Sequence, residues 1–390
     1  MTSIKNGSGP SRIRQINRKA VLSNIRYGGN NSRLKLGKDL GISAAAVTAV
    51  VSELVDEGLL KDAEIIEPSA RKQGRPISLL ELHADAAYSL GIVLRPAGDI
   101  FYIDLAWSDY TGNVTPLLSS KHYNTDSLQS IISGIHESLI TLHKAVPNEE
   151  KIFSLTIGIP GVIENDNNIP IAPKLKCIEG TEFIQQIVKD LSYPVSIHND
   201  VNLGTTSELH QQPRLRNLSF AYLHIYSGVG SGIALKGEIL SGSHGWAGEI
   251  GHIKLGNAPN QYSFEQLLST DGALADLLES LNKPRHALDE LVPYLISGDR
   301  NVNQNIDEYC KTLCDAIWVL HSVLDLNEVM IDFPSDALFE QLLPKLEIIM
   351  KNSPNPVRIS SPAMGHQAGL YGAALTALDL ALDSIELRKK

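Results

Sequence analysis

The stretch YSGVGSGIALKGEILSGSHGWAGEIGHI, residues Tyr226–Ile253, is the part of the chain that decides the fold. It follows the run Phe220–Ile225, which predicts a strand because it is short and rich in aromatic and apolar residues. The chain turns through the glycine-rich segment Ser227–Gly232 and later enters long helical stretches around 264–282 and 305–325. We therefore expect this half of the chain to be an α/β unit that begins with strands.

The same order of elements occurs once before this stretch. Three strand patterns come first, and a helix, a strand, a helix and a strand follow, at residues 88–94, 100–107, 114–122, 127–145, 154–162, 182–191 and 195–198. The repeated order predicts a duplicated α/β body with two lobes and a cleft between them. We place the first lobe at 83–200 and the second at 201–390, the second carrying the effector cleft and a dimerisation surface.

Residues 1–82 predict a separate domain that opens with helices. The first helix spans 11–27 and ends at two glycines. The second begins after Asn31 or Ser32, either of which can cap it by accepting hydrogen bonds from unpaired N–H groups of the first turn. A tight turn at Gly41 then leads into a third helix.

The third helix begins at its cap Ser43 and ends before Gly58. Apolar residues recur in it at i, i+3, i+4 and i+7 and predict one buried face, formed by Val47, Val50, Val51 and Leu54. Two helices joined by a turn of three or four residues form a helix-turn-helix, and the second of them enters the major groove of DNA N-terminus first.

The opposite face of the third helix carries only small side chains, namely Ala44, Ala45, Thr48 and Ser52. Small side chains let a helix lie deep in the groove, where methyl groups contact thymine and Thr48 can bond a base edge or a phosphate. We predict that Ser43, Ala44, Ala45 and Thr48 contact DNA. A helical hairpin in an unrelated core would show the same pattern.

A β-wing is predicted directly after the third helix. A strand begins at Leu59-Leu60 and continues through 64–67, a second returns at 77–82, and the loop between them contains ARKQGRP, residues 70–76. An arginine beside glycine and proline can place its guanidinium in a narrow minor groove, where the negative potential is greatest. We predict DNA contacts from Arg71, Lys72 and Arg75, and the alternative is a solvated loop.

Charge is distributed unevenly along the chain. The net charge is −10, which taken alone argues against nucleic acid as a partner. Residues 1–82 nevertheless hold 13 Lys and Arg against 8 Asp and Glu, whereas the remainder holds 21 against 36. A basic head on an acidic body favours DNA binding by the head.

Composition indicates an ordinary globular protein of the cytoplasm, with 43% hydrophobic and 20% charged residues. No apolar run approaches the roughly 18 residues of a membrane span, and the first nine residues lack an apolar signal core. Three cysteines cannot build a disulfide framework, which fits a reducing compartment. Cys310 and Cys314 lie four apart in a helical stretch and are expected to be buried apolar residues rather than a metal pair.

The body resembles the ROK family (repressors, open reading frames and kinases), which has the actin-like ATPase fold of hexokinases. The resemblance rests on Tyr226–Ile253, on Gly158-Ile-Pro-Gly161 and on Asn199-Asp200-Val-Asn202. It covers essentially the whole chain, and the head together with the body resembles the repressor branch of the family. The implied fold is α/β: an N-terminal winged helix-turn-helix followed by a two-lobed actin-like body.

The resemblance also implies a sugar site. Residues that bind sugar in ROK kinases match Asn199, Asp200, Glu249, His252 and Glu265, and the match of Asp200 is also the catalytic base there. Amide, carboxylate and imidazole groups suit this role because each hydroxyl of a sugar needs a donor or an acceptor. The alternatives are that Asn199-Asp200 caps the next helix and that His252 is a core histidine.

Three departures from the kinases matter. The stretch 90–98, where a phosphate loop is expected, has no Asp and contains Pro96, and 329–336 replaces the paired glycines of an adenosine loop with bulky and acidic residues. We therefore predict no ATP binding and no catalytic residues. The family's cysteine cluster is missing after His252, so we predict no zinc or other metal. Lys174 stands where kinases often carry a sugar-binding Asn, and it either favours an anionic sugar derivative or points to solvent.

The sequence thus predicts a sugar-responsive repressor that contacts no membrane. Its partners are operator DNA, a carbohydrate effector and a second copy of the chain, because a two-fold dimer matches a pseudo-palindromic operator. One alternative is an active hexose kinase with an added DNA-binding head. Another is a regulator whose body binds a protein partner instead of a sugar.

Overall fold

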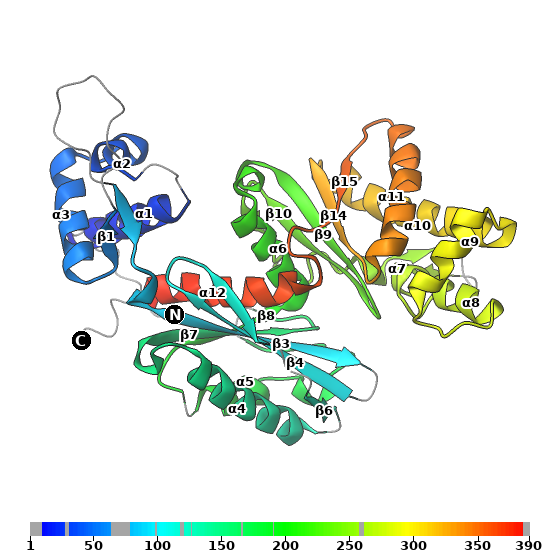
Figure 1. Ribbon diagram of the computed structural model, residues 1–390, viewed down its shortest axis with the longest axis horizontal. Coiled ribbons are helices and arrows are strands. Elements are labelled where there is room, and N and C mark those ends of the chain that lie inside the picture. Colours follow the sequence, from blue (N-terminus) through cyan, green and yellow to red (C-terminus); the bar gives the residue numbers. More distant parts are fainter. Residues whose placement is uncertain are drawn as a thin grey trace.

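The computed structural model comprises a small, mainly helical head and a body of two α/β lobes (Figure 1). It describes residues 10–27, 31–63, 79–97, 100–117, 121–125, 127–164, 167–189, 191–256 and 261–384. The order of head and lobes along the chain confirms the predicted fold class, a winged helix-turn-helix followed by a two-lobed actin-like body.

The head contains the three predicted helices and a short two-stranded sheet. Its elements are α1 (Pro10–Tyr27), α2 (Arg33–Leu40), α3 (Ala44–Asp56), β1 (Leu60–Asp62) and β2 (Leu80–Leu82), the two strands being antiparallel. The hydroxyl of Ser32 accepts from the N–H of Lys35 at 3.3 Å, and that of Ser43 accepts from Ala46 at 3.2 Å. Both predicted caps are therefore confirmed.

Turn geometry and core packing in the head also follow the sequence pattern. Gly41 has φ of +65° and Gly58 has φ of +73°, left-handed values that residues with a side chain rarely adopt. The predicted stripe of α3 is buried together with Leu36 of α2 and apolar residues of α1, so the three helices share one core. Residues 64–78, which include most of the predicted wing, lie outside the described residues.

The two lobes repeat one sheet topology. The first sheet has the order β5-β4-β3-β7-β8, with β6 also paired to β4, and the second has the order β11-β10-β9-β14-β15. In each, three antiparallel strands come first and two parallel strands are added on the other side. The strand bounds are β3 Tyr88–Ala97, β4 Ile100–Asp109, β5 Val114–Leu117, β6 His122–Asn124, β7 Ile152–Ile159, β8 Val195–Asn199, β9 Ser219–Ile225, β10 Val229–Leu235, β11 Glu238–Ile239, β14 Glu328–Asp332 and β15 Arg358–Ser360.

Two helices connect the lobes. The helix α6 (Asp200–Gln211) follows the last strand of the first sheet and packs against β9 and β10 of the second sheet. Conversely, α12 (Ala368–Ser384) follows the last strand of the second sheet and packs against β3 and β7 of the first, and Figure 1 shows it in red above that sheet. The two helices also pack against each other. The division of the lobes at residue 200 stays a prediction.

The remaining helices cover the outer faces of the sheets. In the first lobe they are α4 (Leu128–Ala145) and α5 (Glu182–Val188), and in the second α7 (Phe264–Leu268), α8 (Ala273–Ser280), α9 (Val292–Ser297), α10 (Arg300–Leu324) and α11 (Asp336–Lys351), beside the short strands β12 (Lys254–Leu255) and β13 (Tyr262–Ser263). The helix expected over 264–282 is divided into α7 and α8, since Ser269 and Gly272 between them have non-helical ψ values of 163° and −140°. The strand expected over 114–122 corresponds to β5 and the start of β6.

Two expectations from composition can be checked on the described part of the chain. None of its helices is long and apolar enough to cross a membrane. Cys310 and Cys314 are both buried in α10, and burial raises the pKa of each thiol to about 12. The two cysteines are therefore apolar core residues, as predicted.

Close backbone contact between α6 and α12 gives a test of this arrangement. A Cβ on Gly372 would lie 1.8 Å from the carbonyl oxygen of Leu203, whereas on Gly369 it would lie 3.3 Å from that of Asp200. Helix propensity alone makes a Gly to Ala change stabilising by roughly 0.5–1 kcal/mol. We expect Gly372→Ala instead to lower the free energy of unfolding by about 1–3 kcal/mol in urea denaturation. Gly369→Ala is the control, and an equal response of both variants would contradict the contact.

Candidate functional site

Asn199 and Asp200 lie at the junction of β8 and α6, where the chain passes from the first sheet to the second. The Asn199 side chain caps α6, since its Oδ1 accepts from the N–H groups of Val201 and Asn202 at 3.0 Å each. Its Nδ2 donates to the carbonyl oxygen of Gly161 at 3.1 Å, so two of the sequence motifs meet here. The capping alternative is therefore confirmed for Asn199.

The Asp200 carboxyl is the first side chain of α6 and has an unusual environment. One of its oxygens accepts from the N–H of Val201 at 3.0 Å. The pKa of this carboxyl is raised to about 6. Burial is the largest cause and the charge of Asp332 acts in the same direction, while His224 and the backbone hydrogen bonds oppose them. Asp200 thus changes protonation near neutral pH.

Glu249, His252 and Glu265 come from the segments that follow β10. Burial raises the pKa of Glu249, Asp200 and Glu265 raise it further by charge, and His252 lowers it, so the four groups share one electrostatic environment. The His252 Nε2 lies 3.6 Å from Glu249, and its side chain is 55% exposed. That exposure makes the core-histidine alternative wrong.

Glu265 also fixes the glycine turn. Its Oε2 accepts from the N–H of Val229 at 3.3 Å, at the point where β10 begins. The turn itself is a tight β9–β10 hairpin in which the N–H of Tyr226 donates to the carbonyl oxygen of Gly228. The carboxylates of Asp200, Glu249 and Glu265 are therefore gathered around the mouth of this hairpin.

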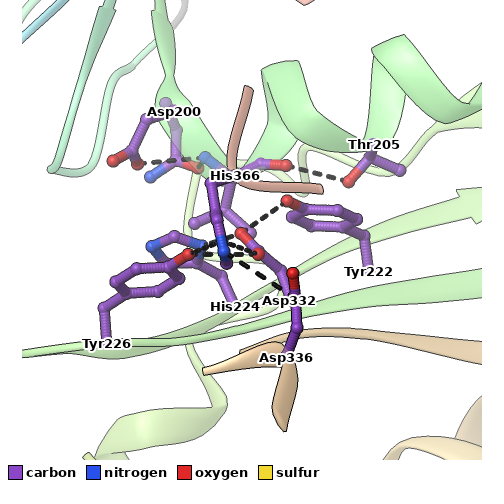
Figure 2. Close-up of polar contacts among 10 residues, drawn as sticks. Asp200, Thr205, Tyr222, His224, Tyr226, Asp332, Asp336 and His366 are labelled. Carbon is purple, nitrogen blue, oxygen red and sulfur yellow. Dashed lines mark hydrogen bonds and ion pairs between the residues drawn. The ribbon is translucent and has the colours of Figure 1, made fainter. Parts of the chain in front are cut away.

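A second polar cluster lies beside Asp200 and was not predicted. Figure 2 shows Asp332, at the end of β14, surrounded by Tyr222, His224, Tyr226 and His366. Asp332 Oδ2 accepts from the Tyr222 hydroxyl at 2.8 Å and lies 2.8 Å from His224 Nδ1, while Oδ1 accepts from the Tyr226 hydroxyl at 3.3 Å and lies 3.4 Å from His366 Nδ1. The Tyr226 hydroxyl also bonds His366 directly.

Charge interactions in this cluster offset the cost of burying Asp332. Burial alone raises the pKa of Asp332, but hydrogen bonds to His224 and His366 outweigh it and hold the pKa well below its usual range. Burial lowers the pKa of His224, yet Asp332 and Asp200 together raise it above its usual value. His224 therefore lies between two carboxylates, one from each lobe.

The sequence carries a signal for this cluster. Tyr222, His224 and Tyr226 alternate along β9 and its end, and alternate residues of a strand point to one face. We expected the acidic residues at 329–336 to repel a nucleotide, but the charge of Asp332 is bound by neighbouring side chains. Its partners His224 and His366 are 142 residues apart in the chain, and no local pattern connects them.

Arg95 faces the cluster from the first lobe. Its guanidinium donates to both oxygens of Asp104, at 2.9 and 3.1 Å, and lies 4.7 Å from the ring centre of Tyr102. The hydrogen bond to Asp104 raises the pKa of Arg95. Lys174, also in the first lobe, is exposed.

The head presents the predicted DNA-facing residues on one exposed surface. Ser43, Ala44, Ala45 and Thr48 are all exposed at the N-terminal end of α3, and the Thr48 hydroxyl donates to the carbonyl oxygen of Ala44 at 2.8 Å. On another side of α3, Glu53 and Glu57 pair with arginines of α1. Arg71, Lys72 and Arg75 lie outside the described residues.

The family of the body is decided by its match to a protein-family model. The ROK family model matches residues 111–380, which are 270 of the 390 residues. The chain belongs to the ROK family. The resemblance drawn from the glycine-rich and Asn-Asp motifs is therefore confirmed.

Several relatives that match nine tenths or more of this ROK protein are repressors. The xylose repressor of Staphylococcus xylosus is 24% identical over 94% of this chain and 95% of its own length. The DNA-binding transcriptional repressor Mlc of Escherichia coli is 24% identical over 93% of each chain. A solved ROK family transcriptional regulator, a homologue of Mlc, has the same fold, with a TM-score of 0.76 at 20% identity over 97% of this chain and 98% of its own.

Kinases of the family are related over less of the chain. The N-acetylmannosamine kinase of Haemophilus influenzae, for example, is 25% identical over 66% of this chain. The zinc ion implied by the family resemblance does not fit the residues present, since residues 253–264 contain no cysteine. Within the described ranges, no three His, Cys, Asp or Glu side chains are placed to hold a metal. One imidazole beside one carboxylate provides too few ligands for structural zinc.

The Asp332 cluster predicts a specific loss of stability. Asp332→Asn leaves two histidines without their carboxylate, and we expect the free energy of unfolding at pH 6 to fall by about 3–5 kcal/mol. Urea denaturation measures this, with Glu340→Gln on the exposed side of α11 as the control. A change below about 1 kcal/mol would contradict a stabilising cluster.

The pH dependence of that loss has a defined sign. Asp332 has a lowered pKa, so its contribution is present above the usual value of 3.8 and is lost as pH falls through the lowered value. His224 and His366 have raised pKa values, so their contribution is complete below 6.5 and is lost as pH rises through the raised values. The difference between wild type and Asp332→Asn is therefore expected to be largest between these limits.

Proposed function

We propose that this ROK protein is a cytoplasmic, sugar-responsive transcriptional repressor that binds operator DNA as a homodimer. The observation that carries the proposal is the combination of a helix-turn-helix head with a cleft that gathers three carboxylates and an imidazole. The head binds DNA and the cleft senses a carbohydrate. Two copies related by two-fold symmetry fit the two half-sites of a pseudo-palindromic operator.

Support for DNA binding comes from the surface of α3. The N-terminal end of this helix exposes Ser43, Ala44, Ala45 and Thr48, which leave room for close approach to base edges. Its acidic residues Glu53 and Glu57 are paired with arginines of α1, which reduces their repulsion of phosphates. Arg71, Lys72 and Arg75, which lie outside the described residues, add positive charge to the head and are proposed to bind phosphates.

Support for a carbohydrate effector comes from the chemistry of the cleft. The carboxylates of Asp200, Glu249 and Glu265 accept hydrogen bonds from hydroxyl groups, and His252 provides an exposed ring nitrogen. Asn199 holds the start of α6 and connects it to Gly161, so it positions Asp200. A polyol satisfies several of these groups at once.

A continuous helix connects the cleft to the head. Asp200 begins α6 and His210 lies near its end, about 15 Å away at 1.5 Å per residue. His210 Nδ1 lies 3.1 Å from the hydroxyl of Tyr27 in α1, and Arg26 of α1 donates to Asp379 of α12 at 2.9 Å. A ligand that moves α6 relative to α12 would therefore change the orientation of the head, and this changes DNA affinity if the ligand prefers one arrangement.

The kinase alternative is weakened by two local features. The strand β3 pairs with β4 along its whole length to Ala97, and Arg95 is bound to Asp104 where a phosphate loop is expected. At the end of β14, the Asp332 cluster lies where paired glycines would admit adenosine. An ATP-coupled assay over a sugar panel decides between the two, since turnover that is lost in Asp200→Asn would identify a kinase.

The recognition surface is tested by adding a charge to it. We expect Ala45→Asp to weaken operator binding at least about 100-fold, because a carboxylate placed in the groove is repelled by phosphates and cannot be solvated there. Fluorescence anisotropy with fragments from the protein's own promoter region, at fixed salt, measures the affinity. Gln304→Glu adds the same charge on the exposed side of α10, and operator binding as strong in Ala45→Asp as in this control would rule out α3 as the recognition helix.

The sugar site is tested by pH. Asp200 has a pKa of about 6, so its carboxylate is the main form above that value and its affinity for hydroxyl donors falls as pH falls through it. Calorimetry with the sugar that a thermal-shift screen identifies should show affinity falling about three- to tenfold from pH 7.5 to 5.5. Asp200→Asn should lose both the affinity for the sugar and its pH dependence. The unliganded variant should be no less stable than wild type at pH 7.5, because a carboxyl group with a raised pKa opposes folding above that pKa. Wild-type affinity in Asp200→Asn would remove Asp200 from the site.

A further inference from the structure

A cavity of about 930 Å³ lies between the head and the body, away from the carboxylate cleft. On the head side it is bounded by α1, and on the body side by α6, α12 and the β10–β11 turn. Its volume is within the range of about 300–1,000 Å³ that small-molecule sites occupy. A molecule in this cavity would contact both parts of the protein.

Three buried polar atoms at this cavity have no hydrogen-bond partner among the described residues. They are the hydroxyl of Tyr110, the hydroxyl of Thr376 and Nε of Arg216, each on a residue that lines the cavity. Tyr110 is only 1% exposed. Buried polar groups in folded proteins are nearly always paired, so each of these three groups keeps the capacity to form one more hydrogen bond.

The charges around the cavity indicate the sign of that occupant. Arg216, which is half-buried, and Lys236, which is exposed, line it, and the Arg216 guanidinium lies 3.4 Å above the ring centre of Tyr27, which holds it in place. Of the acids that line the cavity, Asp379 is already paired with Arg26 at 2.9 Å and with His210 at 3.4 Å. The other, Glu238, is exposed. Positive charge therefore exceeds negative charge at the cavity.

We propose that this junction cavity is a second effector site, which binds a small metabolite carrying a phosphate or carboxylate group. A guanidinium N–H and two hydroxyls donate to the oxyanion, and Arg216 and Lys236 neutralise its charge. Water can fill the cavity, but water does not neutralise the excess of cations. Because the occupant contacts α1 as well as α6 and α12, it changes DNA affinity whenever it favours one orientation of the head.

Binding is tested in Asp200→Asn protein, so that the carboxylate cleft does not contribute. The probes are glucose 6-phosphate, gluconate, inorganic phosphate and glucose at constant ionic strength, measured by thermal shift and calorimetry. We expect saturable binding of glucose 6-phosphate or gluconate, weaker binding of inorganic phosphate and none of glucose. Comparison of the first two separates phosphate from carboxylate recognition. Failure of all three anions to bind would overturn the proposal without touching the sugar site.

Two conservative variants locate the binding to the cavity. Tyr110→Phe and Thr376→Val each remove only a hydroxyl that is unpaired in the free protein, so the unliganded melting temperature should stay the same or rise. Each should weaken anion binding about tenfold, since a hydrogen bond to a charged group is lost. Ser207→Ala removes another buried hydroxyl that is unpaired among the described residues but does not line the cavity, and it should leave anion affinity unchanged. Equal affinity in all three variants would exclude this cavity as the site.

Discussion

The close packing of α6 and α12 is the constraint on which the body depends. Each helix follows the last strand of one sheet and packs against the other sheet, so neither lobe has a complete core alone. The approach is close enough to require glycine: a Cβ on Gly91 of β3 would lie 2.6 Å from the backbone of Ala374, and one on Gly232 of β10 would lie 1.9 Å from the Thr205 hydroxyl. Gly232 belongs to the glycine-rich motif, and its role here is packing rather than phosphate binding.

Sequence reasoning predicted the elements whose cause is local. Caps at Ser32 and Ser43, the stripe of α3 and the repeated strand order all follow from spacing over a few residues, and the structure confirms them. The same reasoning failed near Gly272: one helical stretch was expected over 264–282, but the backbone leaves helical geometry at Ser269 and Gly272 and two helices form. The exchange of α6 and α12 between lobes was not predicted either, because it depends on contacts across the whole chain.

The candidate site was likewise predicted where short motifs mark it and missed where it depends on contacts between distant segments. Family motifs pointed to Asp200, Glu249 and Glu265, and in the structure burial and the charges of Asp200 and Glu265 raise the pKa of Glu249. From the sequence, Asp332 was predicted only to hinder nucleotide binding. Its cluster was not predicted because its partners come from β9 and from a segment just before α12, far apart in the chain. The cluster allows a buried carboxylate to persist, and it gives the second lobe a polar core beside Asp200.

The position of α12 has a consequence for how the protein is made. The first sheet is formed by residues 88–199, yet the helix that packs against β3 and β7 ends only at residue 384. During translation the ribosome must therefore release nearly the whole chain before that face of the sheet is shielded from water. Until then the nascent first lobe exposes apolar strand surface, and a truncated chain that lacks α12 would be retained by chaperones or degraded by proteases.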